Sequence, residues 1–160
     1  MPLLLRDAPR PEDEAEVRRI VTATGFFHDF EIEVAAELVR ERLEKGLASG
    51  YRFLFADQGE TVLGYACYGE IACTIGSFDL YWIAVDPAAQ GQGLGHALMA
   101  GVEAEVRALS GRAIYAETSS KPQYHPTRAF YEKFGFTAVA TLPDFYAPGD
   151  HKIIYSRLVG

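Results

Sequence analysis

The stretch "AVDPAAQGQGLGHALM", residues 84–99, places three glycines between an apolar strand and an apolar helix. A glycine in a helix interior costs about 1 kcal/mol relative to alanine, so Gly91, Gly93 and Gly95 need a reason. The first amides of a helix have no acceptor within the helix and carry partial positive charge. Glycines let an anion approach those amides closely. The pattern therefore predicts a phosphate site, although a turn that only packs tightly on a sheet would also use glycine.

Two common nucleotide-binding motifs do not fit this stretch. A P-loop needs a lysine and a hydroxyl residue after its last glycine, whereas His96 and Ala97 follow here. A dinucleotide fingerprint needs a further glycine, and His96 or Leu98 stands at that position, depending on which glycine begins the count. The phosphate compound is therefore of another kind.

The whole chain has an ordinary globular composition. Its 160 residues are 49% hydrophobic and 23% charged, which predicts one domain over residues 1–160 with a sizeable core. The formal net charge of −7 makes nucleic acid an unsuitable partner and favours a cationic ligand. There is no apolar run of membrane-spanning length and no leader with a cleavage site, so we expect a cytoplasmic protein without a membrane partner. A monomer or a homodimer is expected.

Periodicity and turn residues predict an α/β (α+β) fold of the order β-α-α-β-β-β-α-β-α-β-β, with a mixed, mostly antiparallel sheet of about seven strands and about four helices. The expected helices cover residues 11–25, 31–46, a segment from the glycines to Leu109 that Gly111 ends, and 126–135. The expected strands are 3–7, a hairpin over 51–75, a strand 77–86 buried on both faces, 112–118, 136–142 and 151–158. Cys67 and Cys73 would share one strand and face the same way as buried small hydrophobes.

The residues Gln90-Gly91-Gln92-Gly93-Leu94-Gly95 match a further pattern. They resemble the pyrophosphate loop of the GNAT superfamily of acyl-CoA-dependent N-acyltransferases, written Arg/Gln-x-x-Gly-x-Gly/Ala. "YWIAVDP", residues 81–87, looks like the strand before that loop, and "RAFYEKFGF", residues 128–136, looks like the family's later helix motif. The order of elements also fits, so the resemblance covers nearly the whole chain.

The resemblance implies a GNAT-like domain that moves an acetyl group from acetyl-CoA to a primary amine of a small molecule or peptide, with no metal. The family often has an asparagine and an alanine where Tyr124 and Thr127 stand here, and Ser119, Ser120 or Thr127 could supply the missing hydrogen bonds. Phe130 is also open to a packing role. The implied coenzyme-binding residues are Ile83, Ala84, Val85, Gln90, Gly91, Gln92, Gly93, Leu94, Gly95, His96, Ser119, Thr127, Phe130 and Tyr131.

Amide formation from an amine and a thioester needs a base for the amine, stabilisation of the carbonyl oxygen and a proton for the leaving thiolate. Tyr131 occupies the tyrosine position of the family's helix motif, and a phenol titrates close to an alkyl thiol. The alternative interpretation is that Tyr131 is an aromatic residue of the core without a catalytic role. Asp79, Glu70 and Glu117 are the candidate bases, each also readable as a solvated charge at a strand end. A backbone amide near Ile83–Val85 is the candidate for the oxyanion.

The acceptor site is predicted from two aromatic segments. Residues 142–152 are expected to form a long loop, in which Tyr146 could stack on a substrate and Asp144 or Asp150 could attract an ammonium group. A Pro-Gly turn with solvated charges is the alternative for this segment. Phe27 and Tyr81 are further substrate-binding candidates, with core packing as the alternative for Phe27. A longer acyl-CoA donor, or a non-catalytic coenzyme A-binding module, remains open, as does the identity of the amine.

Overall fold

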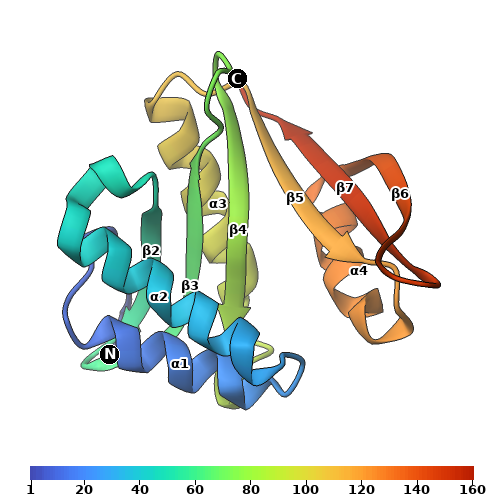
Figure 1. The fold of residues 1–160 in the computed structure, drawn as a ribbon. Helices are drawn as coiled ribbons and strands as arrows, with labels where there is room; N and C mark the ends of the chain where they lie inside the picture. Colours follow the sequence, from blue (N-terminus) through green and yellow to red (C-terminus); the bar gives the residue numbers. More distant parts are fainter. The chain divides into compact units, whose positions relative to one another are not determined.

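A parallel pair of strands, β4 (Ser77–Val85) and β5 (Ala113–Ser119), lies inside the sheet (Figure 1). The computed structural model describes residues 1–160 and has seven strands in the order β1-β2-β3-β4-β5-β7-β6. Parallel neighbours need a crossover, which α3 (Leu94–Ala108) supplies. The mixed sheet and four helices confirm the expected fold class and order. The remaining elements are β1 (Leu3–Arg6), α1 (Asp13–Thr24), α2 (Asp29–Lys45), η1 (Gly46–Ser49), β2 (Arg52–Gln58), β3 (Thr61–Glu70), η2 (Pro87–Ala89), η3 (Pro122–Tyr124), α4 (His125–Phe134), β6 (Thr137–Ala147) and β7 (Asp150–Leu158).

The first of two compact units holds Met1–Gly69 and Tyr81–Ala104. Within it, α1 and α2 cover one face of strands β2 and β3, and α3 covers the other (Figure 1). Phe53 and Phe55 of β2 belong to the core under α1 and α2, whereas Leu54 between them reaches α3. Alternate residues of a strand point to opposite faces, so these strands contribute to two separate cores.

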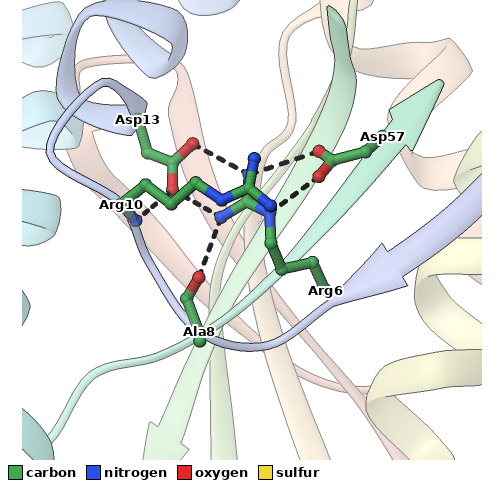
Figure 2. A network of polar contacts seen from close by, with 5 residues as sticks. All are labelled: Arg6, Ala8, Arg10, Asp13 and Asp57. Atoms are coloured by element: carbon green, nitrogen blue, oxygen red, sulfur yellow. Dashed lines mark hydrogen bonds and ion pairs between the residues drawn. The ribbon is translucent and has the colours of Figure 1, made fainter. Parts of the chain in front are cut away.

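A buried ion network ties β1, α1 and β2 together (Figure 2). The Arg6 guanidinium lies 2.7 Å from a carboxylate oxygen of Asp13 and 2.7 Å from one of Asp57. The three side chains are 12%, 2% and 10% exposed in that order. Arg6 also donates to the Ala8 carbonyl, and the Arg10 amide donates to Asp13. Each buried charge therefore has an opposite partner, which is the condition for burying charge at all.

The second unit holds Glu70–Leu80 and Glu105–Gly160. Here β7 pairs with β5 on one side and with the edge strand β6 on the other. α4 packs on these strands through Tyr131, whose ring centroid lies 5.6 Å from that of Tyr155 and 5.4 Å from that of Phe136. All residues of β6 are exposed.

The hairpin expected over residues 51–75 is shorter in the structure. Its second strand, β3, ends at Glu70, and a turn follows. Cys67 is buried as expected, but Cys73 is exposed in the turn with a left-handed φ of 64°. Ile75 of the same turn is 83% exposed. The apolar composition of this segment is misleading because a short apolar run has the same composition in a buried strand and in an exposed turn.

The expectation that residues 77–86 are buried on both faces is wrong. In β4 buried residues alternate with partly exposed ones, and Tyr81 is 41% exposed. A strand of the sheet that has one such face can carry side chains accessible to a ligand, which a fully buried strand cannot.

Residues 142–152 do not form the long loop expected from their composition. β6 continues to Ala147, and only residues 148 and 149 join it to β7. The register shifts between Leu142 and Ala147, and Asp144 has a left-handed φ of 55°. This irregularity accommodates Pro143, which has no amide to donate to the ladder.

α3 ends at Ala108, and Ser110 rather than Gly111 takes the left-handed conformation after it, with a φ of 62°. Glycine at position 111 has another reason, because a Cβ atom there would lie 2.8 Å from the Phe78 ring.

None of the helices, α3 included, combines the length and the apolar character that crossing a membrane needs.

Candidate active site

The turn between β4 and α3 carries its glycines just before the helix rather than inside its first turns. Gly91 and Gly93 have left-handed φ values of 83° and 75°, and only Gly95 lies within α3. No atom lies within 4 Å of an ideal Cβ at either left-handed position, so the space beside this backbone is open. The Ala97 amide donates to the Gly93 carbonyl at 3.0 Å, so this turn leads directly into the first turn of α3. The first amides of a helix carry partial positive charge and attract anions. This geometry suits a phosphate group.

Arg19 of α1 holds the end of β4 next to this turn. Its guanidinium donates to the Asp86 carboxylate at 2.7 Å and to the Val62 carbonyl at 2.9 Å. The Asp86 carboxylate also accepts from the Ala88 amide, and the hydrogen bonds from Arg19 and Ala88 lower the pKa of Asp86. An unpaired carboxylate beside an anion site would repel the anion. Arg19 therefore fixes the end of β4 and compensates the negative charge of Asp86.

The predicted pantetheine-binding residues, Ile83, Ala84 and Val85, are the last three residues of β4. Ala84 is 7% exposed and belongs to the core under α1 and α2, whereas its two neighbours are partly exposed. The predicted loop residues Gln90, Gln92 and His96 are exposed and Leu94 is buried. Within the first unit, the structure thus places the whole predicted coenzyme segment in one continuous strand, turn and helix start.

Aromatic rings surround the two predicted acceptor residues of the first unit. Phe27, in the turn between α1 and α2, packs edge-on against Trp82 with ring centroids 4.9 Å apart. Tyr81 meets Tyr51 in the same manner at 5.5 Å. The sequence pattern does not single out Trp82 or Tyr51, because only the folded chain brings these rings together.

Tyr131 lies in α4 and is 6% exposed. The rings of Phe130, Phe136 and Tyr155 lie around it, with centroids 5.4–5.8 Å away. Burial raises the pKa of the Tyr131 phenol, so its hydroxyl keeps its proton at neutral pH. Phe130 and Thr127, the other predicted coenzyme contacts of this helix, are partly buried.

The protein itself uses the serine hydroxyls that were expected to replace the family's asparagine. Ser119 donates to the buried carboxylate of Asp150, and Ser120 accepts from the His151 amide at 2.9 Å. On the same strand, the buried hydroxyl of Thr118 has no hydrogen-bond partner. The Thr118 hydroxyl is therefore a better candidate for binding a ligand than the two serine hydroxyls. The sequence pattern does not single out Thr118 for this role.

Asp79 of β4 and Glu117 of β5 point to one face of the second unit. The register pairs Asp79 with Tyr115, and Glu117 follows two residues later on the same side. Burial, and then the charge of Glu117, raise the pKa of Asp79. Glu70 is exposed at the end of β3. Of the three predicted carboxylates, the structure therefore groups these two.

Lys152 of β7 joins this pair of carboxylates. Its Nζ atom lies 2.8 Å from Oε2 of Glu117 and 3.8 Å from the centroid of the Phe145 ring. The Lys152 side chain is only 13% exposed. The sequence pattern does not single out this lysine. Alternation in the last strand assigns it to a face, but only the pairing of β5 with β7 shows which carboxylate it meets.

Asp144 and Tyr146, the predicted acceptor residues of the C-terminal hairpin, lie in β6. The Asp144 amide donates to Nδ1 of His151 at 2.9 Å, and its carboxylate accepts from the Gly149 amide at 2.7 Å. Tyr146 is 47% exposed, and its ring meets that of Phe145 edge-on at 5.1 Å. Asp144 thus has a structural task in the hairpin, while Tyr146 presents a ring at the surface.

The chain is similar to a family of known proteins and to several solved structures. A model of the acetyltransferase (GNAT) domain matches residues 49–138. A GNAT-family protein from Desulfovibrio desulfuricans is 50% identical to the chain, with a TM-score of 0.98 and coverage of 99% of this chain and 100% of that one. The ribosomal-protein-S18-alanine N-acetyltransferase from Escherichia coli is 19% identical, with a TM-score of 0.78 and coverage of 99% and 95%. The protein yncA from Salmonella typhimurium, solved with its cofactor acetyl-CoA, is 19% identical, with a TM-score of 0.76 and coverage of 100% and 95%.

No protein of the curated set matches the chain at a significant level. The two likenesses at 19% identity show the fold alone. The domain model, which covers more than half of the chain, and the half-identical relative, which is aligned over almost its full length, show more than the fold. Together with the glycine turn between β4 and α3, they establish that this chain is an acyltransferase and belongs to the GNAT family of acetyltransferases.

Proposed function

We propose that the chain transfers the acetyl group of acetyl-CoA directly to a primary amine of a small molecule or peptide. The observation that carries this proposal is the open glycine turn, in which Gly91 and Gly93 leave room beside the start of α3. A cradle of this kind fits a pyrophosphate, and the structure of yncA with acetyl-CoA supports the choice of coenzyme.

In this proposal the amides of Gly91 to His96 bind the pyrophosphate of coenzyme A, with Gln90 and Gln92 beside it. The backbone of Ile83 to Val85 pairs with the pantetheine arm as an added strand would, and a backbone amide there stabilises the carbonyl oxygen. In the second unit, Thr127, Phe130 and the Ser119 hydroxyl are proposed as coenzyme contacts, and the unpartnered hydroxyl of Thr118 is a further candidate. Acetyl-CoA supplies the acyl group and the thiol that leaves.

The proton transfers are assigned to two residues of the second unit. Asp79 accepts the proton of the acceptor ammonium group, because its raised pKa makes it a stronger base than an ordinary aspartate. Tyr131 donates its proton to the departing thiolate, and its raised pKa ensures that the proton is present. Glu117 and Glu70 are the alternative bases.

The acceptor is expected to carry an ammonium group next to an apolar or aromatic part. Phe27, Tyr81 and Tyr146 offer rings, and Asp144 adds negative charge. The Escherichia coli neighbour is named for a protein N-terminal alanine, which suggests peptides for the first amine panel. Membership of an acetyltransferase family favours catalysis over a module that only binds coenzyme A. A longer acyl donor is the second candidate.

The coenzyme site is tested by Gly93→Val with Gly25→Val as its control. Both glycines have a φ of 75° with nothing within 4 Å of an ideal Cβ, so the two variants carry the same backbone strain. Gly93→Val should weaken acetyl-CoA binding at least about tenfold by calorimetry, because the side chain occupies the anion's approach. Gly25→Val should bind normally. Equal affinities in the two folded variants would remove the glycine turn from the site.

The leaving-group role is tested by Tyr131→Phe, which removes one oxygen and keeps the ring. Because the lost interaction exists only in the transition state, kcat should fall about 100-fold while KM changes little. Thiol release from acetyl-CoA over a panel of amines measures both constants. Turnover within about threefold of the unmodified protein would assign the proton to solvent.

A further inference from the structure

Asp79 of β4 and Glu117 of β5 share one face of the second unit, and Lys152 of the next strand, β7, forms an ion pair with Glu117. Lys152 lies 2.8 Å from Glu117, on the neighbouring strand β5. Its other close contact is the face of the Phe145 ring, at 3.8 Å from the centroid. Because a ring face attracts a cation, both contacts stabilise the ammonium group in this place.

The position of this lysine follows from the sheet register. Lys152 is paired with Ser119, and Glu117 is paired with Ile154, so the lysine and the glutamate are diagonal neighbours on one face. The lysine is 13% exposed and the glutamate 47% exposed. The ammonium group is thus fixed by the fold, and the carboxylate that it holds still reaches the surface.

The charged and titratable groups that face Asp79 come from several strands. Tyr115 is its partner on β5, and Tyr81 follows it on β4. The charges that act on Asp79 are the negative charge of Glu117 and the positive charge of Lys152. Glu70 lies at the exposed end of β3.

We propose that Lys152 is a positioning residue that divides the work between the two carboxylates: its ion pair holds the Glu117 carboxylate in place, and Asp79 is left to take the proton of the acceptor ammonium group. This inference rests on the proposed function, in which Asp79 is the base. Two nearby carboxylates without a cation would compete for one proton and titrate as a coupled pair. Because Lys152 is bound to Glu117, Asp79 is the carboxylate that accepts the proton of the acceptor ammonium group.

The arrangement also sets the working range of the base. The fixed charge of Glu117 makes Asp79 hold a proton more strongly, while the nearby ammonium group of Lys152 opposes this effect. Loss of the ammonium group should therefore shift the titration of Asp79 to higher pH.

The test replaces Lys152 by methionine, which keeps the length and apolar stem against Phe145 but removes the charge. Titration of the free protein, followed by the side-chain carboxyl carbon signals in NMR, reports on Asp79 and Glu117 without any substrate. We expect the Asp79 carboxyl to titrate at higher pH in Lys152→Met, because the positive charge of Lys152 opposes the rise in its pKa that burial and Glu117 cause. Lys152→Arg should restore this titration, because it restores the charge.

Lys45→Met is the matched control, because it breaks the exposed pair of Lys45 with Glu41 on α2, at 2.6 Å. It should leave both carboxyl titrations unchanged, and circular dichroism establishes that each variant is folded. Unchanged titration of Asp79 and Glu117 in folded Lys152→Met would overturn the inference, whatever the identity of the base.

Kinetics separate this inference from the proposed function. The acidic limb of the kcat/KM profile should move to higher pH in Lys152→Met, return in Lys152→Arg and disappear in Asp79→Asn. If the carboxyl titrations move but Asp79→Asn keeps the acidic limb, Lys152 retains its effect on the pair and Asp79 is overturned as the base. If kcat falls in Lys152→Met but neither the acidic limb of the kcat/KM profile nor the carboxyl titrations change, Lys152 has only a structural role. That result would overturn the inference.

Discussion

Two clusters in this protein place one cation beside two carboxylates, and they differ in how the cation is shared. In the first unit, Arg6 donates to both of its carboxylates at once (Figure 2). In the second unit, Lys152 pairs with Glu117 and leaves Asp79 without a direct partner. We call the first cluster closed, because its cation binds both carboxylates, and the second open, because its cation binds only one of them.

The chemistry of the two cations explains the difference. The guanidinium group of Arg6 is a planar fork with several donors, so it satisfies two carboxylates in fixed directions. Burial alone would lower the pKa of Arg6, but the hydrogen bonds to Asp13 and Asp57 raise it overall. A lysine is a compact point charge that holds one carboxylate closely. A closed cluster therefore joins structural elements, whereas an open one keeps a group whose protonation can change.

The largest effect is expected from breaking the closed cluster with Asp13→Ala. The side chain of Asp13 is 2% exposed, so its loss leaves the buried Arg6 with half of its compensation. We expect the free energy of unfolding in urea to fall by about 3–5 kcal/mol. Glu33→Ala, which removes a 61% exposed partner of Arg18, is the control and should leave the free energy of unfolding nearly unchanged. Equal losses in the two variants would show that burial does not distinguish these pairs.

A smaller effect is expected from Arg6→Lys, which keeps the charge and removes the fork. A lysine in this place cannot donate to both carboxylates in the same geometry, so the closed cluster should resemble the open one. We expect a loss of about 2 kcal/mol in urea unfolding. Arg40→Lys changes an exposed pair with Glu14 and should be nearly neutral. A neutral Arg6→Lys would mean that the charge alone holds β1, α1 and β2 together.

The smallest effect is expected from Asp79→Asn, measured as stability against pH. The pKa of Asp79 is raised in the folded protein, chiefly by burial. Its contribution to stability is therefore present below the unfolded value near pH 4 and lost as the pH rises through the folded value. The variant should gain a few tenths of a kcal/mol on the unmodified protein between about pH 4 and pH 7, because solvent screens this partly buried group. A difference that stays constant with pH would contradict the raised pKa.

The sequence alone determined the features of this protein that depend on neighbouring residues. The order of strands and helices follows from hydrophobic periodicity and turn residues, which act over a few positions. The motif from Gln90 to Gly95 was sufficient for the family because the conformation of this turn requires glycine at two positions, with φ values of 83° and 75°. Tyr131 was likewise recognised from its local helix motif, although its catalytic role remains a prediction.

The tertiary structure decided which distant residues meet. Whether Lys152 lies beside Glu117 depends on the register between β5 and β7, and a shift of one residue would send the lysine to the other face. The same holds for the C-terminal hairpin, where pairing extends β6 through a segment whose composition predicts a loop. Cys73 is exposed for the reverse reason, since the chain leaves the sheet at Glu70 despite an apolar sequence. Strand pairing is a contact between residues far apart in the chain, so no local pattern contains it.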